Sequence, residues 1–133
     1  MKLTISNIAW PDKDDAEILS CLPKYGVEAI EIAPTRIWPD WTIDTSATAA
    51  YLDELSGYGL QCSSLQAIVY NRPQLRLFGS ADERAALVDH LKFVADIAAS
   101  LGAGPVVFGA PKNRRKGERA DAEAREKAIF FDR

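Results

Sequence analysis

The organisation of the chain follows from one segment, Tyr25-Gly26-Val27-Glu28-Ala29-Ile30-Glu31-Ile32-Ala33-Pro34. Gly26 can adopt the left-handed conformation that ends a helix, and the apolar residue after it can begin a strand. Ile30 and Ile32 then fall on one face of the strand, and Glu31 falls on the other. The segment therefore predicts a strand over residues 27–33 and a helical segment that ends at Gly26, with Pro23 ending the regular helix near Leu22.

The same junction recurs at Tyr58-Gly59-Leu60 and at Leu101-Gly102-Ala103. At each junction a helical pattern ends and a strand pattern begins. Three equal junctions with alternating elements indicate right-handed βαβ crossovers and a parallel sheet. The sequence therefore predicts an α/β fold, a (βα)4 segment in one domain over residues 1–133. The expected strands cover residues 1–10, 27–33, 60–69 and 105–108, and the expected helices cover residues 12–25, 47–56, 80–101 and 120–131.

Two architectures can complete a (βα)4 segment: an open doubly wound sheet, or the half of an eight-stranded barrel. Strands buried on both faces of an open sheet are almost wholly Val, Ile and Leu. Here one face of each of the first three strands carries small or polar residues, and no strand is followed by a phosphate-binding glycine turn. The pattern favours half of a TIM barrel. The small or polar residues are Thr4, Ser6, Ala29, Glu31, Ser64 and Gln66.

Composition narrows the class of protein. The 133 residues carry a net charge of −3, which argues against a nucleic acid partner, because phosphate binding requires a basic field. No run of about 18 apolar residues and no signal-peptide pattern is present, so we expect a cytoplasmic protein without a membrane contact. Cys21 and Cys62 lack a CxxC partner and are expected to be reduced. His90 is the single histidine, which excludes a His-rich metal site.

Three segments resemble one family. The segment Tyr25–Pro34 resembles the second strand of the xylose isomerase-like TIM-barrel superfamily, which includes sugar phosphate isomerases and epimerases and endonuclease IV. Ser64-Leu65-Gln66 with Leu75-Arg76-Leu77-Phe78 is similar to its third strand and loop. The segment Val106-Val107-Phe108-Gly109-Ala110-Pro111-Lys112-Asn113-Arg114 resembles the fourth strand of one sugar isomerase/epimerase branch. The resemblance covers the whole chain as the N-terminal half of such a barrel.

The resemblance implies a sugar (phosphate) isomerase/epimerase that carries out metal-assisted proton transfer next to a sugar carbonyl. A divalent ion, Mn²⁺ or Mg²⁺, is implied for the complete barrel. In this superfamily the metal ligands lie mostly on strands five to eight, so this segment is expected to hold no metal ion by itself. A small sugar or sugar phosphate is the implied partner.

The candidate site residues lie where the predicted strands end. Glu31 either accepts a substrate hydroxyl and takes part in catalysis, or is held by a neighbouring basic residue for structure. Gln66 occupies the equivalent place on the third strand and would bind a sugar hydroxyl, unless the backbone satisfies it. Asn7 and Trp10 end the first strand, and Trp10 either covers the apolar face of a sugar or belongs to the core.

A basic segment follows the fourth strand. Residues 112–119 hold five basic side chains and one acidic side chain. Lys112, Asn113 and Arg114 lie closest to the strand end and are predicted to bind a phosphate or another substrate anion. The alternative is a solvated loop. Asp12, Asp14 and Asp15 are acidic neighbours that we assign to the start of a helix, with Asp12 as a cap, rather than to a metal site.

Two other functions remain open from the sequence. The first is a non-catalytic half-barrel that forms a homodimer through its exposed sheet edges. The second is a fragment of an AP endonuclease-like DNA repair enzyme, which the acidic balance disfavours.

Overall fold

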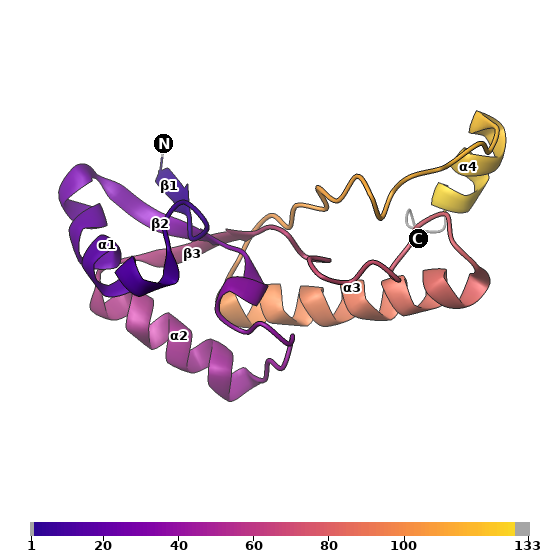
Figure 1. The fold of residues 1–133 in the computed structure, drawn as a ribbon. Coiled ribbons are helices and arrows are strands. Elements are labelled where there is room, and N and C mark those ends of the chain that lie inside the picture. The colour runs from indigo at the N-terminus through magenta and orange to yellow at the C-terminus, as the bar shows by residue number, and fades with distance from the viewer. Residues whose placement is uncertain (1, 130–133) are drawn as a thin grey trace. The chain divides into compact units, whose positions relative to one another are not determined.

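The computed structural model describes residues 2–129, which form two compact units (Figure 1). The first unit comprises Met1–Ile68 and Val94–Phe108, and the second comprises Val69–Phe93 and Gly109–Arg133. The two units are interleaved along the chain, so neither is a continuous stretch of sequence. The organisation of residues 1–133 as one domain stays a prediction.

The first unit contains a parallel sheet whose strands follow the order of the sequence. Its strands are β1 (Leu3–Ser6), β2 (Val27–Ile32) and β3 (Gln61–Leu65). A doubly wound sheet changes direction at its first strand, whereas a barrel adds each new strand beside the last one. Right-handed crossovers in one direction place the connecting helices on one face. The predicted α/β fold, with parallel strands alternating with helices as in part of a TIM barrel, is confirmed.

The predicted fourth strand, Pro105 to Phe108, is reduced to one parallel bridge between Leu65 and Val106. Two hydrogen bonds make this bridge: Leu65 N donates to Pro105 O at 3.1 Å, and Val107 N donates to Leu65 O at 2.8 Å. Proline has no amide proton to extend the ladder. No strand within residues 2–129 pairs with the far side of this segment, and Val107 is 47% exposed.

The first predicted helix, residues 12–25, is divided into three pieces. A 3₁₀ turn, η1 (Asp12–Asp14), precedes α1 (Asp15–Cys21), and a second 3₁₀ turn, η2 (Leu22–Tyr25), follows it. The prediction that Asp12 caps the helix is wrong, because no side chain caps η1 or α1 and the Asp12 carboxylate contacts Arg36 instead. The other turn and helix of this unit are η3 (Pro34–Arg36) and α2 (Thr45–Gly57).

Glycine conformation confirms the predicted junctions. Gly26, Gly59 and Gly102 have φ angles of +78°, +77° and +66°, in the left-handed region that favours glycine. Each ends a helical segment and returns the chain toward the sheet. α2 packs against β3 (Figure 1), and its residue Leu55 is fully buried. The core of the first unit is therefore made by the apolar faces that the alternation predicts; its fully buried members include Ile30, Ile32, Leu55 and Leu65.

The second unit contains the start of α3 (Ala81–Leu101), whose last turns belong to the first unit, and α4 (Asp121–Ala128). A capping box begins α3: Ser80 N donates to Glu83 Oε2 at 2.7 Å, and Glu83 N donates to Ser80 Oγ at 3.2 Å. The predicted end of the last helix, at residues 130–131, lies outside the described residues. None of the helices in residues 2–129 is both long and apolar enough to cross a membrane.

Candidate functional site

Polar side chains form a row across the three strands of the first unit. Ser6 pairs with Glu31, and Glu31 pairs with Ser64, so the three side chains share one face of the sheet near its carboxyl end. This is the end of a barrel at which active sites lie. An open hollow of about 460 Å³ lies here, lined by Thr4, Ile5, Ser6, Glu31, Ser63, Ser64 and Pro105. Four of its lining residues bear a hydroxyl group, and one bears a carboxylate.

Glu31 is half-buried in this hollow. Ser64 Oγ donates a hydrogen bond to Glu31 Oε1 at 3.2 Å. No Lys or Arg within residues 2–129 pairs with the Glu31 carboxylate. The alternative that a basic neighbour holds this residue therefore does not apply to the described chain. A carboxylate beside several hydroxyl groups can accept a hydrogen bond from a bound polyol or take up a proton.

Gln66 follows β3 directly and reaches across the sheet. Its amide Nε2 donates a hydrogen bond to Ser6 Oγ, and its backbone N donates to Ile32 O at 2.9 Å. The sequence pattern predicts Ser6 on the inward face but does not mark it as a site residue. The structure brings Gln66, Ser6 and Glu31 together at the carboxyl end of the sheet. Sugar binding by Gln66 stays a prediction.

Asn7 joins the ends of β1 and β2. Its backbone N donates to Glu31 O at 3.0 Å, and its side-chain Oδ1 accepts from Ala33 N at 2.9 Å. Its Nδ2 donates to Ala33 O at 3.5 Å, and the residue is only 3% exposed. The amide therefore satisfies buried backbone groups beside Glu31. Substrate contact by Asn7 stays a prediction, whereas its observed hydrogen bonds fix the end of the strand.

Trp10 belongs to an ionic cluster that sequence patterns do not reveal. Its indole Nε1 donates to Asp15 Oδ1 at 2.7 Å, and its carbonyl accepts from Arg36 Nη2 at 3.3 Å. Arg36 also holds both carboxylate oxygens of Asp15, at 2.8 and 3.1 Å, and its Nε lies 3.1 Å from Asp12 Oδ1. Arg36 comes from the turn after β2, so only the folded chain brings it to Trp10. The cluster fixes the orientation of the Trp10 ring.

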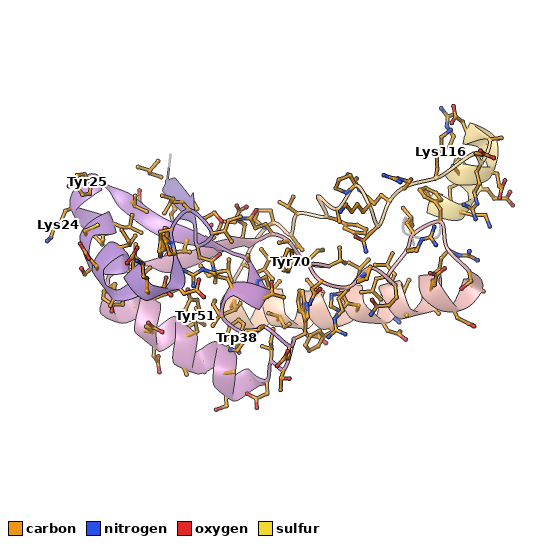
Figure 2. The ribbon with its side chains drawn as sticks, viewed as in Figure 1. Lys24, Tyr25, Trp38, Tyr51, Tyr70 and Lys116 are labelled. Atoms are coloured by element: carbon orange, nitrogen blue, oxygen red, sulfur yellow. The ribbon has the colours of Figure 1, made fainter. Side chains whose placement is uncertain are left out.

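An aromatic pair joins the segment after β2 to α2. Trp38 and Tyr51 meet edge to face, with ring centroids 5.7 Å apart and an interplanar angle of 74° (Figure 2). Burial raises the pKa of the Tyr51 phenol well above its usual range, and the Glu54 and Asp15 carboxylates raise it further. Tyr51 is thus a neutral donor rather than a base. Burial likewise raises the pKa of the Cys62 thiol to about 11, so this cysteine is not a nucleophile at neutral pH.

The predicted anion-binding residues lie in the second unit. Asn113 is half-buried and donates to two backbone carbonyls, whereas Lys112 and Arg114 are exposed. Further along, Lys116 pairs with Asp121 and Arg119 pairs with Glu123 at the start of α4. These two cations therefore stabilise the local structure.

The described residues do not fit a metal ion. No group of three or more His, Cys, Asp or Glu side chains in residues 2–129 could hold one. Asp12 and Asp15 are instead occupied by Arg36.

Comparison with known proteins supports the fold. No protein-family model matches the chain, and no curated protein matches it. Among solved structures, a sugar phosphate isomerase/epimerase from Parabacteroides distasonis is similar, with a TM-score of 0.65 and 17% identity. The similarity covers 98% of this chain and 44% of that structure, so this chain spans less than half the length of that protein. The chain therefore has the parallel α/β fold of part of a TIM barrel.

Proposed function

We propose that this chain forms the sugar-binding part of a sugar or sugar phosphate isomerase/epimerase. The observation that carries the proposal is the hydroxyl-lined hollow at the carboxyl end of the sheet, with the Glu31 carboxylate in it. Sugars present several hydroxyl groups that both donate and accept, so serine, threonine and carboxylate groups are matched to them. The fold of the solved isomerase/epimerase supports the same reaction class.

In this proposal Glu31 acts on the sugar directly. An isomerase or epimerase removes a proton from the carbon next to a carbonyl and returns it to a neighbouring carbon or to the opposite face. Glu31 accepts either that proton or a hydrogen bond from a substrate hydroxyl, and Ser64 holds its Oε1 in place. Gln66 binds a hydroxyl from the neighbouring strand end. Lys112, Asn113 and Arg114 stay separate predictions, because they belong to the other unit.

Titration with D-xylose, D-glucose and D-fructose, followed by amide chemical shifts, tests this function. We expect shifts concentrated at residues 4–6, 31 and 63–64, and a Kd about tenfold higher in Glu31→Gln, because hydrogen bonds to a charged group are the strong ones. Glu28→Gln is the matched control, since Glu28 lies on the same strand but lines a hollow at the other end of the sheet.

Shifts elsewhere, or equal weakening by Glu28→Gln, would contradict the proposal. An isomerase assay of the same 133-residue chain with Mn²⁺ or Mg²⁺ complements this titration. No turnover is expected, because the described residues do not fit a metal ion. Turnover that requires the added ion would contradict this account of the chain.

Exposed apolar residues at the sheet edges favour a second candidate function, self-association as a homodimer. Leu3 on β1 is 50% exposed, and Val106 and Val107 at the other edge are 39% and 47% exposed. Open strand edges with apolar side chains pair readily with another chain. Sedimentation equilibrium should then give twice the monomer mass, and Val107→Lys should restore the monomer. A monomer at high concentration excludes this candidate.

A further inference from the structure

The hollow at the carboxyl end of the sheet contains one carboxylate and no cation. Glu31 supplies the carboxylate, and its Oε1 accepts from Ser64 Oγ at 3.2 Å. No group within residues 2–129 hydrogen-bonds to its other oxygen, Oε2. One oxygen of Glu31 is therefore available to a bound molecule. The neutral residues that line the hollow with it are Thr4, Ile5, Ser6, Ser63, Ser64 and Pro105.

The four cations of the first unit do not line this hollow. Lys2 lines the hollow at the other end of the sheet, and Arg36 is already held by two aspartates. Lys13 and Lys24 lie in the 3₁₀ turns η1 and η2. The negative charge of Glu31 is thus not offset by any residue of the hollow.

The first unit as a whole is acidic. Its two segments, residues 1–68 and 94–108, contain eleven Asp and Glu, four Lys and Arg and no His, a net charge of −7. Because the whole chain carries −3, the second unit carries +4. A hollow concentrates the field of the charges around it. The local carboxylate and the charge of the unit therefore act in the same direction, against an anion and in favour of a neutral or positively charged ligand.

We propose that this hollow selects sugars by charge: it takes an uncharged, hydroxyl-bearing part of a sugar and excludes a phosphate or carboxylate group. The inference rests on the proposed function and narrows it, because the part of the sugar that contacts Glu31 is then unphosphorylated. A sugar hydroxyl donates to the carboxylate and accepts from serine or threonine, whereas a phosphate dianion offers acceptors alone and repels Glu31. An ammonium group forms a charge-assisted hydrogen bond with a carboxylate, so the preference reverses for a cationic sugar.

Four sugars that share one ring test the proposal: D-glucose, D-glucosamine, D-glucuronate and D-glucose 6-phosphate. Their Kd values are measured from amide chemical shifts at neutral pH and equal, low ionic strength. We expect the two anionic sugars to bind about two- to fivefold less tightly than D-glucose, and D-glucosamine to bind tighter by a similar factor, as for partly exposed charge pairs. High salt should reduce these differences, because it screens charge.

Matched variants assign the preference to Glu31. Glu31→Gln retains the size of the side chain and should remove most of the discrimination between charged and uncharged sugars, even though D-glucose itself binds less tightly. Glu28→Gln removes the same charge from the same strand, at the other end of the sheet, and should retain the discrimination. An equal effect of the two variants would assign the preference to the net charge of the unit and overturn the proposal.

The outcomes separate this inference from the proposed function. Equal Kd values for all four sugars, or tighter binding of D-glucose 6-phosphate, with shifts at residues 4–6, 31 and 63–64 would overturn charge selection and leave the proposed function intact. Binding of D-glucosamine without D-glucose would count against the proposed function alone, and binding of none of the four would overturn both. If Glu31→Gln does not fold, the series with the unsubstituted chain decides the question.

Discussion

Asn7→Ala is expected to lower the free energy of unfolding by about 1–3 kcal/mol. The substitution leaves the N–H of Ala33 without its partner and removes one of the two donors to Ala33 O, which keeps its bond from Arg36 N at 3.0 Å. Ala33 is only 2% exposed, so water cannot replace the lost amide. An unsatisfied buried backbone group costs roughly 1–3 kcal/mol, which is more than a hydrogen bond gains. Urea denaturation followed by circular dichroism measures the loss.

Two further variants make this test specific to the side-chain amide. Asn7→Asp retains the acceptor for Ala33 N but not the donor to Ala33 O, so we expect an intermediate loss of stability. Gln74→Ala truncates an exposed amide in a loop and should change stability by less than about 0.5 kcal/mol. If Asn7→Ala is as stable as Gln74→Ala, Asn7 does not hold the strand ends together.

Asp15→Ala is expected to cost about 1–3 kcal/mol and to release the Trp10 ring. The Arg36 side chain is 12% exposed, and without Asp15 its charge would be opposed, among residues 2–129, only by Asp12, whose side chain is 80% exposed. Removing one partner of a buried pair costs about 3–5 kcal/mol, and we reduce this figure because the Asp15 side chain is 42% exposed. The Trp10 indole proton should also exchange faster with solvent, since Asp15 accepts it at 2.7 Å.

The indole proton resonance of Trp10 distinguishes a lost ion pair from general destabilisation. In Asp15→Asn the side-chain oxygen still accepts from Trp10 Nε1, so we expect a slower indole exchange than in Asp15→Ala. Glu17→Ala removes an exposed carboxylate from the same helix and should affect neither stability nor exchange. Unchanged indole exchange in Asp15→Ala would exclude Asp15 as the residue that orients Trp10.

Local rules were sufficient to predict the architecture. The glycine junctions and the alternation of Ile30 and Ile32 with Glu31 are properties of neighbouring residues, so a parallel α/β chain could be predicted without coordinates. The capping box at Ser80 and Glu83 was predictable for the same reason. The fourth strand was less predictable, because a strand depends on what pairs with it. Pro105 and the absence of a described partner at its far side leave only one bridge there.

The site could be predicted only in part. Candidates at strand ends, such as Glu31 and Gln66, follow from the direction of parallel strands. The partners that hold them could not be predicted, because Ser64 and Ser6 look like any small residue of the inward face. Arg36 was missed for a stronger reason. It lies in the turn after β2, and its contacts depend on how the segment around Asp15 folds back toward it.

The interleaving of the two units limits how the protein can be divided. The chain leaves the first unit after Ile68, returns at Val94, and leaves again after Phe108. A truncation at residue 68 would therefore remove the buried side chains of Val94, Ile97 and Leu101, which complete the first core. Neither unit can be expressed as one continuous fragment that retains its complete core. Proteolytic cleavage between the units is for this reason expected to unfold the sheet rather than to release a stably folded fragment.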